Sequence, residues 1–238
     1  MEREHGKVSL VQAASEEVIY KIDIPANRHD LLCLEGLAKA LRVFLGKDQQ
    51  PPSFSVTPKK TYMTREASVA SIRPHVLCAI LRDITFTPAS YRSFIELQEK
   101  FHQNIGRNRT LVSIGTHDLD KIQAPFIYRA LPPSEISFVP LNRTEPMTGV
   151  ELMNHLESDL QLRRYLSIIR EAPLYPVIMD SGGHVLSLPP IINGDFSKMS
   201  VTTKNILLEV TATDLTKAHV VLQNMCAIFS VYCDTPFS

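Results

Sequence analysis

Apolar residues recur with two different periods in this sequence, and this mixture limits the fold more than any other feature. Short apolar, β-branched runs are typical of buried strands, whereas apolar residues at about every third or fourth position are typical of amphipathic helices. Ser181-Gly182-Gly183 separates two of the runs, as expected for a hairpin. The chain is therefore predicted to be an α+β protein with mixed, largely antiparallel sheets flanked by helices. Strands are expected at 76–81, 111–114, 175–179, 184–188 and 206–211, and helices at 91–105, at 148–169 and after Asp214 as N-cap.

The first part of the chain is expected to form a small helical and β piece of its own. Residues 17–24 alternate imperfectly, which predicts a strand, and apolar residues recur at helical spacing over 31–45 after Asp30 as a cap. Residues 46–61 are polar and rich in proline, without an apolar period. This stretch is typical of a domain boundary. The predicted division is a part of an N-terminal domain at 1–50 and a main domain at 51–238.

Charge, cysteine content and the polar start of the chain narrow the classes of function. The sequence has 25 basic and 25 acidic residues, so it lacks the broad basic field of a protein that grips duplex nucleic acid, but a local basic strip is compatible with it. Its four cysteines form no Cys-x-x-Cys pair, which argues against a structural zinc site. No apolar run approaches the ~20 residues of a membrane span, and residues 1–7 resemble neither a secretory signal nor a transit peptide. We therefore expect a cytoplasmic protein with no membrane partner.

Common catalytic and nucleotide-binding motifs are absent, so the candidate residues are polar side chains within apolar segments. Glu209 lies in an apolar run at 205–211, and Thr211 shares its face by strand periodicity. A buried carboxylate needs a donor. Two interpretations stay open: Glu209 faces water or a salt bridge, or it lines a pocket together with Thr211.

Three further places could carry polar chemistry. Ser187 and Asn193 flank a Pro-Pro pair that stiffens the backbone and could present both side chains; otherwise the segment is a hairpin exit ending in an Asn-Gly turn. His117, just past a predicted strand, is either structural or functional. Arg107 and Arg109 form a small basic cluster that is either a solvated loop after a helix or a contact for phosphate.

Three separated motifs then carry a resemblance to a known family. They are Ile-Pro-Ala-Asn-Arg-His-Asp-Leu-Leu-Cys-Leu-Glu-Gly-Leu at 24–37, Ile-Gly-Thr-His-Asp-Leu-Asp at 114–120 and Pro-Pro-Ile-Ile-Asn-Gly at 189–194. In this order they closely resemble the β subunit of eukaryotic and archaeal cytosolic phenylalanyl-tRNA synthetase, over essentially the whole chain. The chain resembles the N-terminal part of that subunit and lacks the catalytic class II motifs.

The resemblance implies an editing module that hydrolyses tyrosine mischarged onto tRNA(Phe). Because the sequence offers no Ser-His-Asp or Cys-His arrangement, we expect hydrolysis by a positioned water, without a metal or a covalent intermediate. The resemblance also implies an α subunit as partner in a heterotetramer of two α and two β subunits, with ATP and magnesium used at a separate synthetic site and no cofactor in this part. The alternative is a non-catalytic module that binds an aromatic amino acid or tRNA, or assists assembly, and is inactive outside the heterotetramer. The residues implied to line the editing pocket are His117, Ile178 as an apolar wall, Ser187, Asn193, Glu209 and Thr211, and we assign tRNA contact to Arg107 and Arg109.

Overall fold

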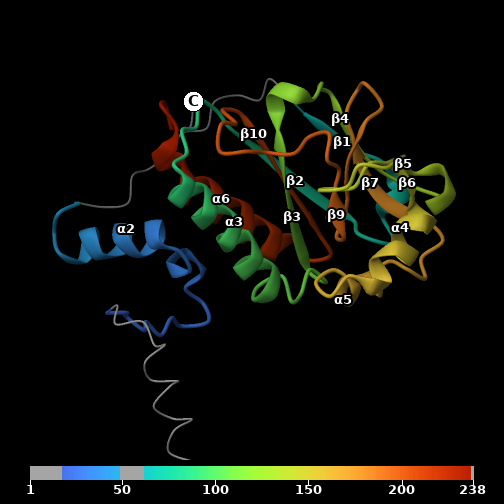
Figure 1. Ribbon diagram of the computed structural model, residues 1–238. Helices are drawn as coiled ribbons and strands as arrows, with labels where there is room; N and C mark the ends of the chain where they lie inside the picture. The colour runs from blue at the N-terminus through green and yellow to red at the C-terminus, as the bar shows by residue number, and fades with distance from the viewer. Residues whose placement is uncertain (1–17, 49–61, 237–238) are drawn as a thin grey trace, which may run out of the picture.

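A three-stranded antiparallel sheet forms one half of the main body. The computed structural model describes residues 18–48 and 62–236. The strand order is β2 (His75–Leu81), β10 (Ile206–Ala212) and β3 (Val112–Asp118), so β10 is central and β3 lies at an edge. Helices α3 (Pro88–Gln103) and α6 (Leu215–Phe229) cover one face of this sheet (Figure 1). Their apolar stripes pack against alternate residues of β3 and β10 to form the largest core cluster.

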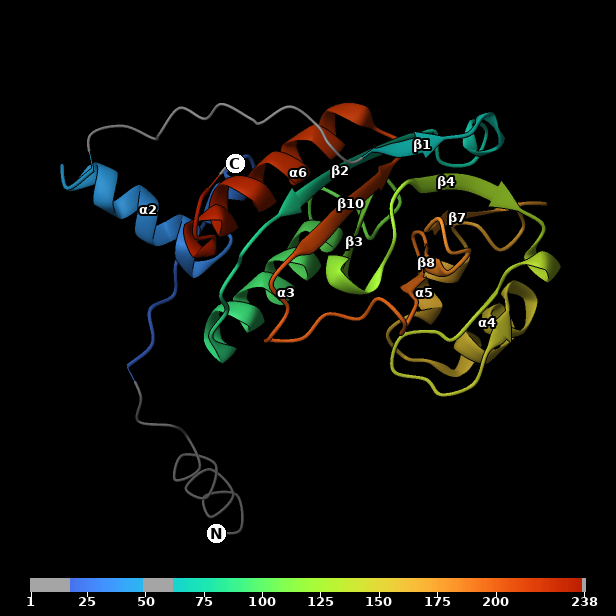
Figure 2. The same ribbon diagram turned by 90° about the horizontal axis from the view of Figure 1, so that it is seen from above.

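A five-stranded sheet forms the other half. Its order is β1 (Met63–Arg65), β4 (Phe126–Leu131), β7 (Tyr175–Met179), β8 (Val185–Leu188) and β9 (Ile192–Asn193); β1 and β4 are parallel and the other pairs antiparallel. The short helices α4 (Gly149–His155) and α5 (Arg163–Leu166) lie on the side of this sheet away from α3 and α6 (Figure 2). A small pair, β5 (Ser137–Phe138) and β6 (Met147–Thr148), adjoins them. The predicted α+β class with largely antiparallel sheets is confirmed.

The remaining elements are one helix near the start of the described chain and six short 3₁₀ turns. The helix is α2 (Leu34–Phe44), and the turns are η1 (His29–Leu31), η2 (Ala67–Val69), η3 (Leu119–Lys121), η4 (Pro133–Glu135), η5 (Leu156–Ser158) and η6 (Ser230–Tyr232). The start of α2 is bound to the main body. Glu35 accepts hydrogen bonds from Ser93 Oγ on α3 and from Tyr232 Oη, at 2.6 and 3.0 Å. In the part of the chain that the structure describes, no helix combines the length and apolar character needed to cross a bilayer.

The two sheets pack face to face, and this packing creates the interior that matters for function. All seven residues of both β3 and β10 are buried, so the face opposite the helices is covered too. Leu207 of β10 packs there in one cluster with Tyr128 of β4 and Ile178 of β7. Polar side chains that share the face of Leu207 therefore lie between the two sheets.

Local signals explain the helices that the sequence predicted well. Thr87 and Ser90 form a reciprocal capping box at the start of α3, with Pro88 in its first turn. Asp214 caps α6 as predicted, because its carboxylate accepts the backbone N–H of Lys217 at 3.0 Å. The predicted hairpin forms from β7 and β8, with a shift of register at Ile178 and Met179.

Two predictions about helices are wrong in part, one on the length of a helix and one on a capping residue. The expected helix over 148–169 is broken, because the Asp159 carboxylate accepts the backbone N–H groups of Gln161 and Leu162 in place of the next helical carbonyls. The first helix is capped by Cys33, not by Asp30, whose side chain pairs with Arg28 instead.

Two further predictions about strands and turns need correction. Residues 18–24 form no strand, since no other strand of the described ranges lies alongside to pair with them; residue 17 and most of the proline-rich stretch, 49–61, lie outside the described residues. The tight turn falls at 188–191, where the N–H of Ile191 donates to the carbonyl of Leu188 and the Pro189–Pro190 peptide is cis. Asn193 lies on the returning strand β9, where it pairs with Ser187 of β8, and Gly194 follows it in an isolated bridge to Pro140.

Candidate functional site

The carboxylate of Glu209 lies in the interior between the two sheets. The side chain projects from the central strand β10, and the residue is only 2% exposed. Its Oε1 accepts a hydrogen bond from Ser187 Oγ on β8 at 2.7 Å, so the bond joins the two sheets. Its Oε2 is buried and has no hydrogen-bond partner among the described residues. Because a buried carboxylate oxygen without a donor is costly, this atom marks a place where a donor from a ligand or water would be stabilised.

His117 lies beside Glu209 with one free ring nitrogen. The two residues stand on neighbouring strands, and Nε2 of His117 is 3.8 Å from Oε1 of Glu209, which is beyond hydrogen-bond distance. The other ring nitrogen, Nδ1, is 2.8 Å from Ser197 Oγ. His117 is fully buried, and its Nε2 lacks a partner within the described part of the chain. The sequence placed His117 just past a strand, but β3 continues to Asp118 because it pairs with β10 over its whole length.

Gly115 makes room for the Glu209 side chain. The two residues are directly opposite each other in the pairing of β3 with β10. A Cβ atom at Gly115 would lie 2.1 Å from Oε1 of Glu209 and 2.8 Å from its Cγ. The sequence analysis did not single out Gly115, although glycine inside a strand is a signal of such close approach.

Ser187, Asn193 and Ile178 come together on the facing sheet. Ser187 pairs with Ile178 on one side and with Asn193 on the other. Ile178 is completely buried and supplies an apolar surface. Asn193 Nδ2 donates to the carbonyl of Thr116 on β3 at 3.3 Å, which is a second link between the sheets.

Thr211 is tied to a buried arginine that the sequence analysis missed. Arg73 is 1% exposed, and its Nε donates to Thr211 Oγ1 at 2.9 Å while its Nη2 donates to the Thr211 carbonyl at 2.8 Å. Burial lowers the pKa of Arg73 to about 10, so the group is still cationic at neutral pH. The backbone carbonyl of Arg73 accepts the hydroxyl of Tyr128, whose pKa is raised by burial. The interior thus holds a positive charge in the same region as Glu209.

The two arginines predicted to contact tRNA lie in different surroundings. Arg107 is exposed. Arg109 is turned inward: its side chain is 13% exposed and donates to Glu99 on α3 and to the carbonyls of Pro190 and Ile191. The tRNA contacts of both residues stay predictions, and the structure gives Arg109 a different set of partners.

A cavity of about 280 Å³ lies beside Asn193, at the edge of β3. Its wall is largely apolar and also includes the amide groups of Asn142 and Asn193 and the ammonium group of Lys198. A molecule bound in this cavity would touch Asn193 and Thr116, the two residues that link the sheets. A second cavity of about 260 Å³ lies between the start of α2 and α3, and none of the predicted site residues lines it. The lining of the first cavity is Tyr91, Ile95, Thr116, Leu141, Asn142, Asn193, Lys198 and Met199.

Comparisons with known proteins agree over almost the whole chain. A family model described as the Phe-tRNA synthetase beta subunit B1 domain matches residues 1–47, and a model of the B3/4 domain matches residues 66–224. The phenylalanine–tRNA ligase beta subunit of Drosophila melanogaster is 56% identical over 238 residues, which is 99% of this chain and 40% of that protein. The human subunit is 52% identical over 240 residues, with coverage of 99% and 40%.

A solved structure shows the same fold. The crystal structure of an N-terminal fragment of the phenylalanyl-tRNA synthetase beta-subunit from Pyrococcus horikoshii matches with a TM-score of 0.84 at 29% identity, covering 98% of this chain and 69% of that one. The fold consists of two packed sheets that enclose a polar interior, and the family model of the B3/4 domain matches most of the chain. The protein is therefore a B3/4-domain protein. The chain belongs to the family of phenylalanine–tRNA ligase β subunits, as the sequence motifs predicted. It spans about 40% of the length of these relatives.

Proposed function

We propose that this chain is the editing part of a phenylalanine–tRNA ligase β subunit and hydrolyses tyrosine from mischarged tRNA(Phe). The observation that carries the proposal is the pair of buried polar atoms without partners among the described residues, Oε2 of Glu209 and Nε2 of His117. They face an interior that also contains the apolar wall of Ile178. A hydroxyl group placed between these two atoms would give both of them a partner.

Selection of tyrosine over phenylalanine follows from this chemistry. A tyrosine hydroxyl can donate to a carboxylate oxygen and accept from an imidazole N–H. Phenylalanine would leave both protein atoms unpaired in a buried place, and a site built to bond a hydroxyl rejects the analogue that lacks it by up to ~10⁴-fold or more. The synthetic site of the ligase works in the opposite sense, so that the two sites act as successive filters.

Hydrolysis of the ester is assigned to a positioned water molecule. An aminoacyl ester is intrinsically labile, and the serine and threonine of the site are already engaged, Ser187 with Glu209 and Thr211 with Arg73. We therefore assign these groups to orientation of substrate and water, and propose neither a covalent intermediate nor a metal in this part.

The wider assembly is also a proposal. The relatives are named beta subunits, which supports pairing with an α subunit, in our proposal as a heterotetramer that binds tRNA(Phe). The Arabidopsis thaliana relative, 53% identical over 226 residues, is named as a cytoplasmic form, and we place this chain in the cytoplasm as well. We assign ATP and magnesium to a synthetic site outside this chain.

A deacylation assay on the complete ligase tests the proposal. Wild-type enzyme is expected to release tyrosine from Tyr-tRNA(Phe) much faster than phenylalanine from Phe-tRNA(Phe). Glu209→Ala removes the hydroxyl acceptor and is expected to reduce the ratio of the two rates by about 10- to 100-fold, as the loss of one buried hydrogen bond of 1–3 kcal/mol implies.

Two results would contradict this assignment. An unchanged ratio in the Glu209→Ala enzyme would remove Glu209 from hydroxyl recognition. Tyrosine binding by calorimetry without any deacylation would favour the alternative, a non-catalytic binding or assembly module. The matched control is Glu96→Ala, since Glu96 is an exposed carboxylate on α3.

A further inference from the structure

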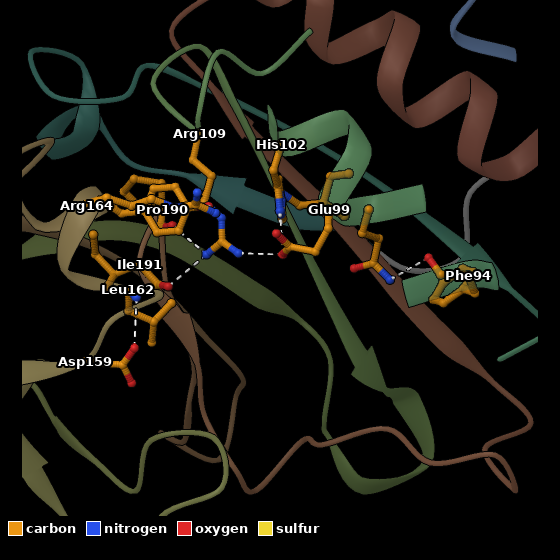
Figure 3. Close-up of polar contacts among 12 residues, drawn as sticks. Phe94, Glu99, His102, Arg109, Asp159, Leu162, Arg164, Pro190 and Ile191 are labelled. Carbon is orange, nitrogen blue, oxygen red and sulfur yellow. Dashed lines mark hydrogen bonds and ion pairs between the residues drawn. The ribbon is translucent and has the colours of Figure 1, made fainter. Parts of the chain in front are cut away.

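The turn that joins β8 to β9 is held by one arginine from another part of the chain. Nη1 of Arg109 donates to the carbonyl of Ile191 at 3.0 Å and approaches that of Pro190 at 3.4 Å (Figure 3). Its guanidinium also lies over the ring of buried Tyr165, 4.3 Å from the ring centroid. Since Ser187 and Asn193 stand just before and just after this turn, its position fixes where both side chains lie.

The same arginine is anchored to the other half of the molecule. Nη2 of Arg109 donates to Oε1 of Glu99 on α3 at 2.8 Å, and that oxygen is also 3.2 Å from Nδ1 of His102 (Figure 3). Nε2 of His102 accepts the backbone N–H of Ile114 at 2.9 Å. Ile114 belongs to β3, the strand that carries Gly115 and His117. A continuous chain of hydrogen bonds therefore runs from β3 to the β8–β9 turn.

The protonation states suit this chain of bonds. Burial lowers the pKa of His102 to about 4, so at neutral pH the ring is uncharged, with Nδ1–H as donor and Nε2 as acceptor. The hydrogen bond from His102 and the charge of Arg109 lower the pKa of Glu99 to about 2. Glu99 is therefore a carboxylate throughout the physiological range, and its bond to Arg109 is charge-assisted.

The backbone before and at Arg109 is held in an unusual conformation. Arg107, Asn108 and Arg109 have φ values of 46°, 53° and 65°, which is the left-handed region that residues other than glycine seldom adopt. Such conformations cost free energy and persist where the surroundings impose them. Here the N–H of Arg109 donates to the carbonyl of His102 at 3.2 Å, so the loop bends back onto the end of α3. This bend brings the Arg109 side chain toward the turn.

We propose that Arg109 is a positioning residue of the candidate site: through Glu99 and His102 it sets the β8–β9 turn, and with it Ser187 and Asn193, relative to β3. The inference rests on the proposed editing function. In this inference Arg109 positions the turn, whereas the sequence had suggested that it contacts a tRNA phosphate. The other side-chain links between the two sheets described above are Ser187 to Glu209, from β8 to β10, and Asn193 to Thr116, from β9 to β3.

Steady-state deacylation of Tyr-tRNA(Phe) by the complete ligase tests the role. Arg109→Met is expected to lower kcat by about 10- to 100-fold, the effect of a site displaced by roughly an ångström, while KM for the tRNA changes less than about twofold. The kcat of the Arg109→Lys enzyme is expected to lie between those of wild type and Arg109→Met. An ammonium group cannot bind the turn carbonyls and Glu99 together as the planar guanidinium does. A raised KM with a weaker salt dependence and an unchanged kcat would instead show a phosphate contact and overturn the inference.

Arg164 provides the matched control. Its guanidinium lies over the same Tyr165 ring at 4.7 Å and donates to the Tyr165 hydroxyl. It has no hydrogen bond to the turn among the interactions of the described chain. Arg164→Met is therefore expected to leave kcat and KM unchanged, and an equal loss in both variants would reduce Arg109 to a general packing role.

Hydrogen exchange separates failure of this inference from failure of the proposed function. The amides of Ile191 and Gly194 donate within the turn and strand, to the carbonyls of Leu188 and Leu186. Faster exchange at these amides in the Arg109→Met ligase, but not in the Arg164→Met ligase, is expected whether or not the enzyme releases tyrosine. If wild-type enzyme releases tyrosine while the Arg109 variant alters neither exchange nor kcat, the positioning role is wrong and the editing function stands.

Discussion

Replacing Gly115 by alanine is expected to disable the candidate site while every polar residue of that site is retained. The new Cβ would lie 2.1 Å from Oε1 and 2.7 Å from Cδ of Glu209, so the carboxylate must leave the position in which it accepts the hydrogen bond from Ser187. Because the displaced carboxylate stays buried with a lost hydrogen bond, we expect the free energy of unfolding to fall by about 1–3 kcal/mol. We expect the preference for Tyr- over Phe-tRNA(Phe) to fall by about 10- to 100-fold. Denaturant unfolding and the two deacylation rates measure these effects.

A second substitution makes this prediction specific to the contact between Gly115 and Glu209. Glu209→Asp shortens the side chain by one methylene, so in the Gly115→Ala background it is expected to restore part of the lost stability. Gly182→Ala is the control, since its Cβ would meet only His184, which is half exposed, and the neighbouring carboxylate of Asp180 at 3.0 Å or more. If the stability losses of Gly115→Ala and Glu209→Asp simply add in the double variant, the contact between Gly115 and Glu209 is not the reason that glycine is needed at position 115.

Removal of the buried guanidinium of Arg73 is expected to give the largest loss of stability. Arg73→Met keeps much of the side-chain volume but removes the donor to Oγ1 and to the carbonyl of Thr211, whereas the carbonyl of Thr110, 3.2 Å from Arg73 Nη1, keeps a hydrogen bond from Thr213 Oγ1. Buried groups that lose charged partners cost 1.5–3 kcal/mol each, with incomplete additivity, so we expect a loss of about 3 kcal/mol. For a chain of this size, the loss corresponds to a decrease in Tm of about 6–12 °C.

Calorimetry on Arg73→Met and on Arg92→Met measures this loss against a matched change. Arg92 is exposed on α3, and its replacement is expected to alter Tm by less than about 2 °C. A double-mutant cycle of Arg73→Met with Thr211→Val then isolates the pairwise contribution. Equal Tm values for wild type and Arg73→Met would show that water replaces the guanidinium without loss.

The long helices and five of the ten strands in the described ranges, β2, β3, β7, β8 and β10, were predicted, because their signals are local. The caps at Thr87 and Asp214 use residues within one helical turn, and the hairpin between β7 and β8 follows from Gly182 and Gly183. The prediction failed over 148–169, where the Asp159 carboxylate competes with helical hydrogen bonds. Apolar periodicity does not report that competition, because the period continues on both sides of the break.

The candidate site was predictable only in part. Motif resemblance pointed to Glu209, His117 and Ser187, and the structure brings them together, although their role with a ligand stays a prediction. Arg73 gave no comparable signal, since an arginine before a proline is typical of a loop. Arg109 was predicted to belong with Arg107 to a small basic cluster, either in a solvated loop or in contact with phosphate, whereas the structure turns its side chain inward.

The sequence by itself determined the family, the helices α3 and α6 and the strands β2, β3, β7, β8 and β10, all of which depend on residues close together in the chain or on short motifs. Only the tertiary structure decided which polar groups meet. Arg73 and Thr211 are 138 positions apart, and Ser187 reaches Glu209 from a different sheet. Their contact depends on how two sheets pack face to face, and packing is decided by the summed shape and burial of many side chains. Hydrogen bonds that are weak in water then become decisive, because burial removes the solvent that would otherwise satisfy the same groups.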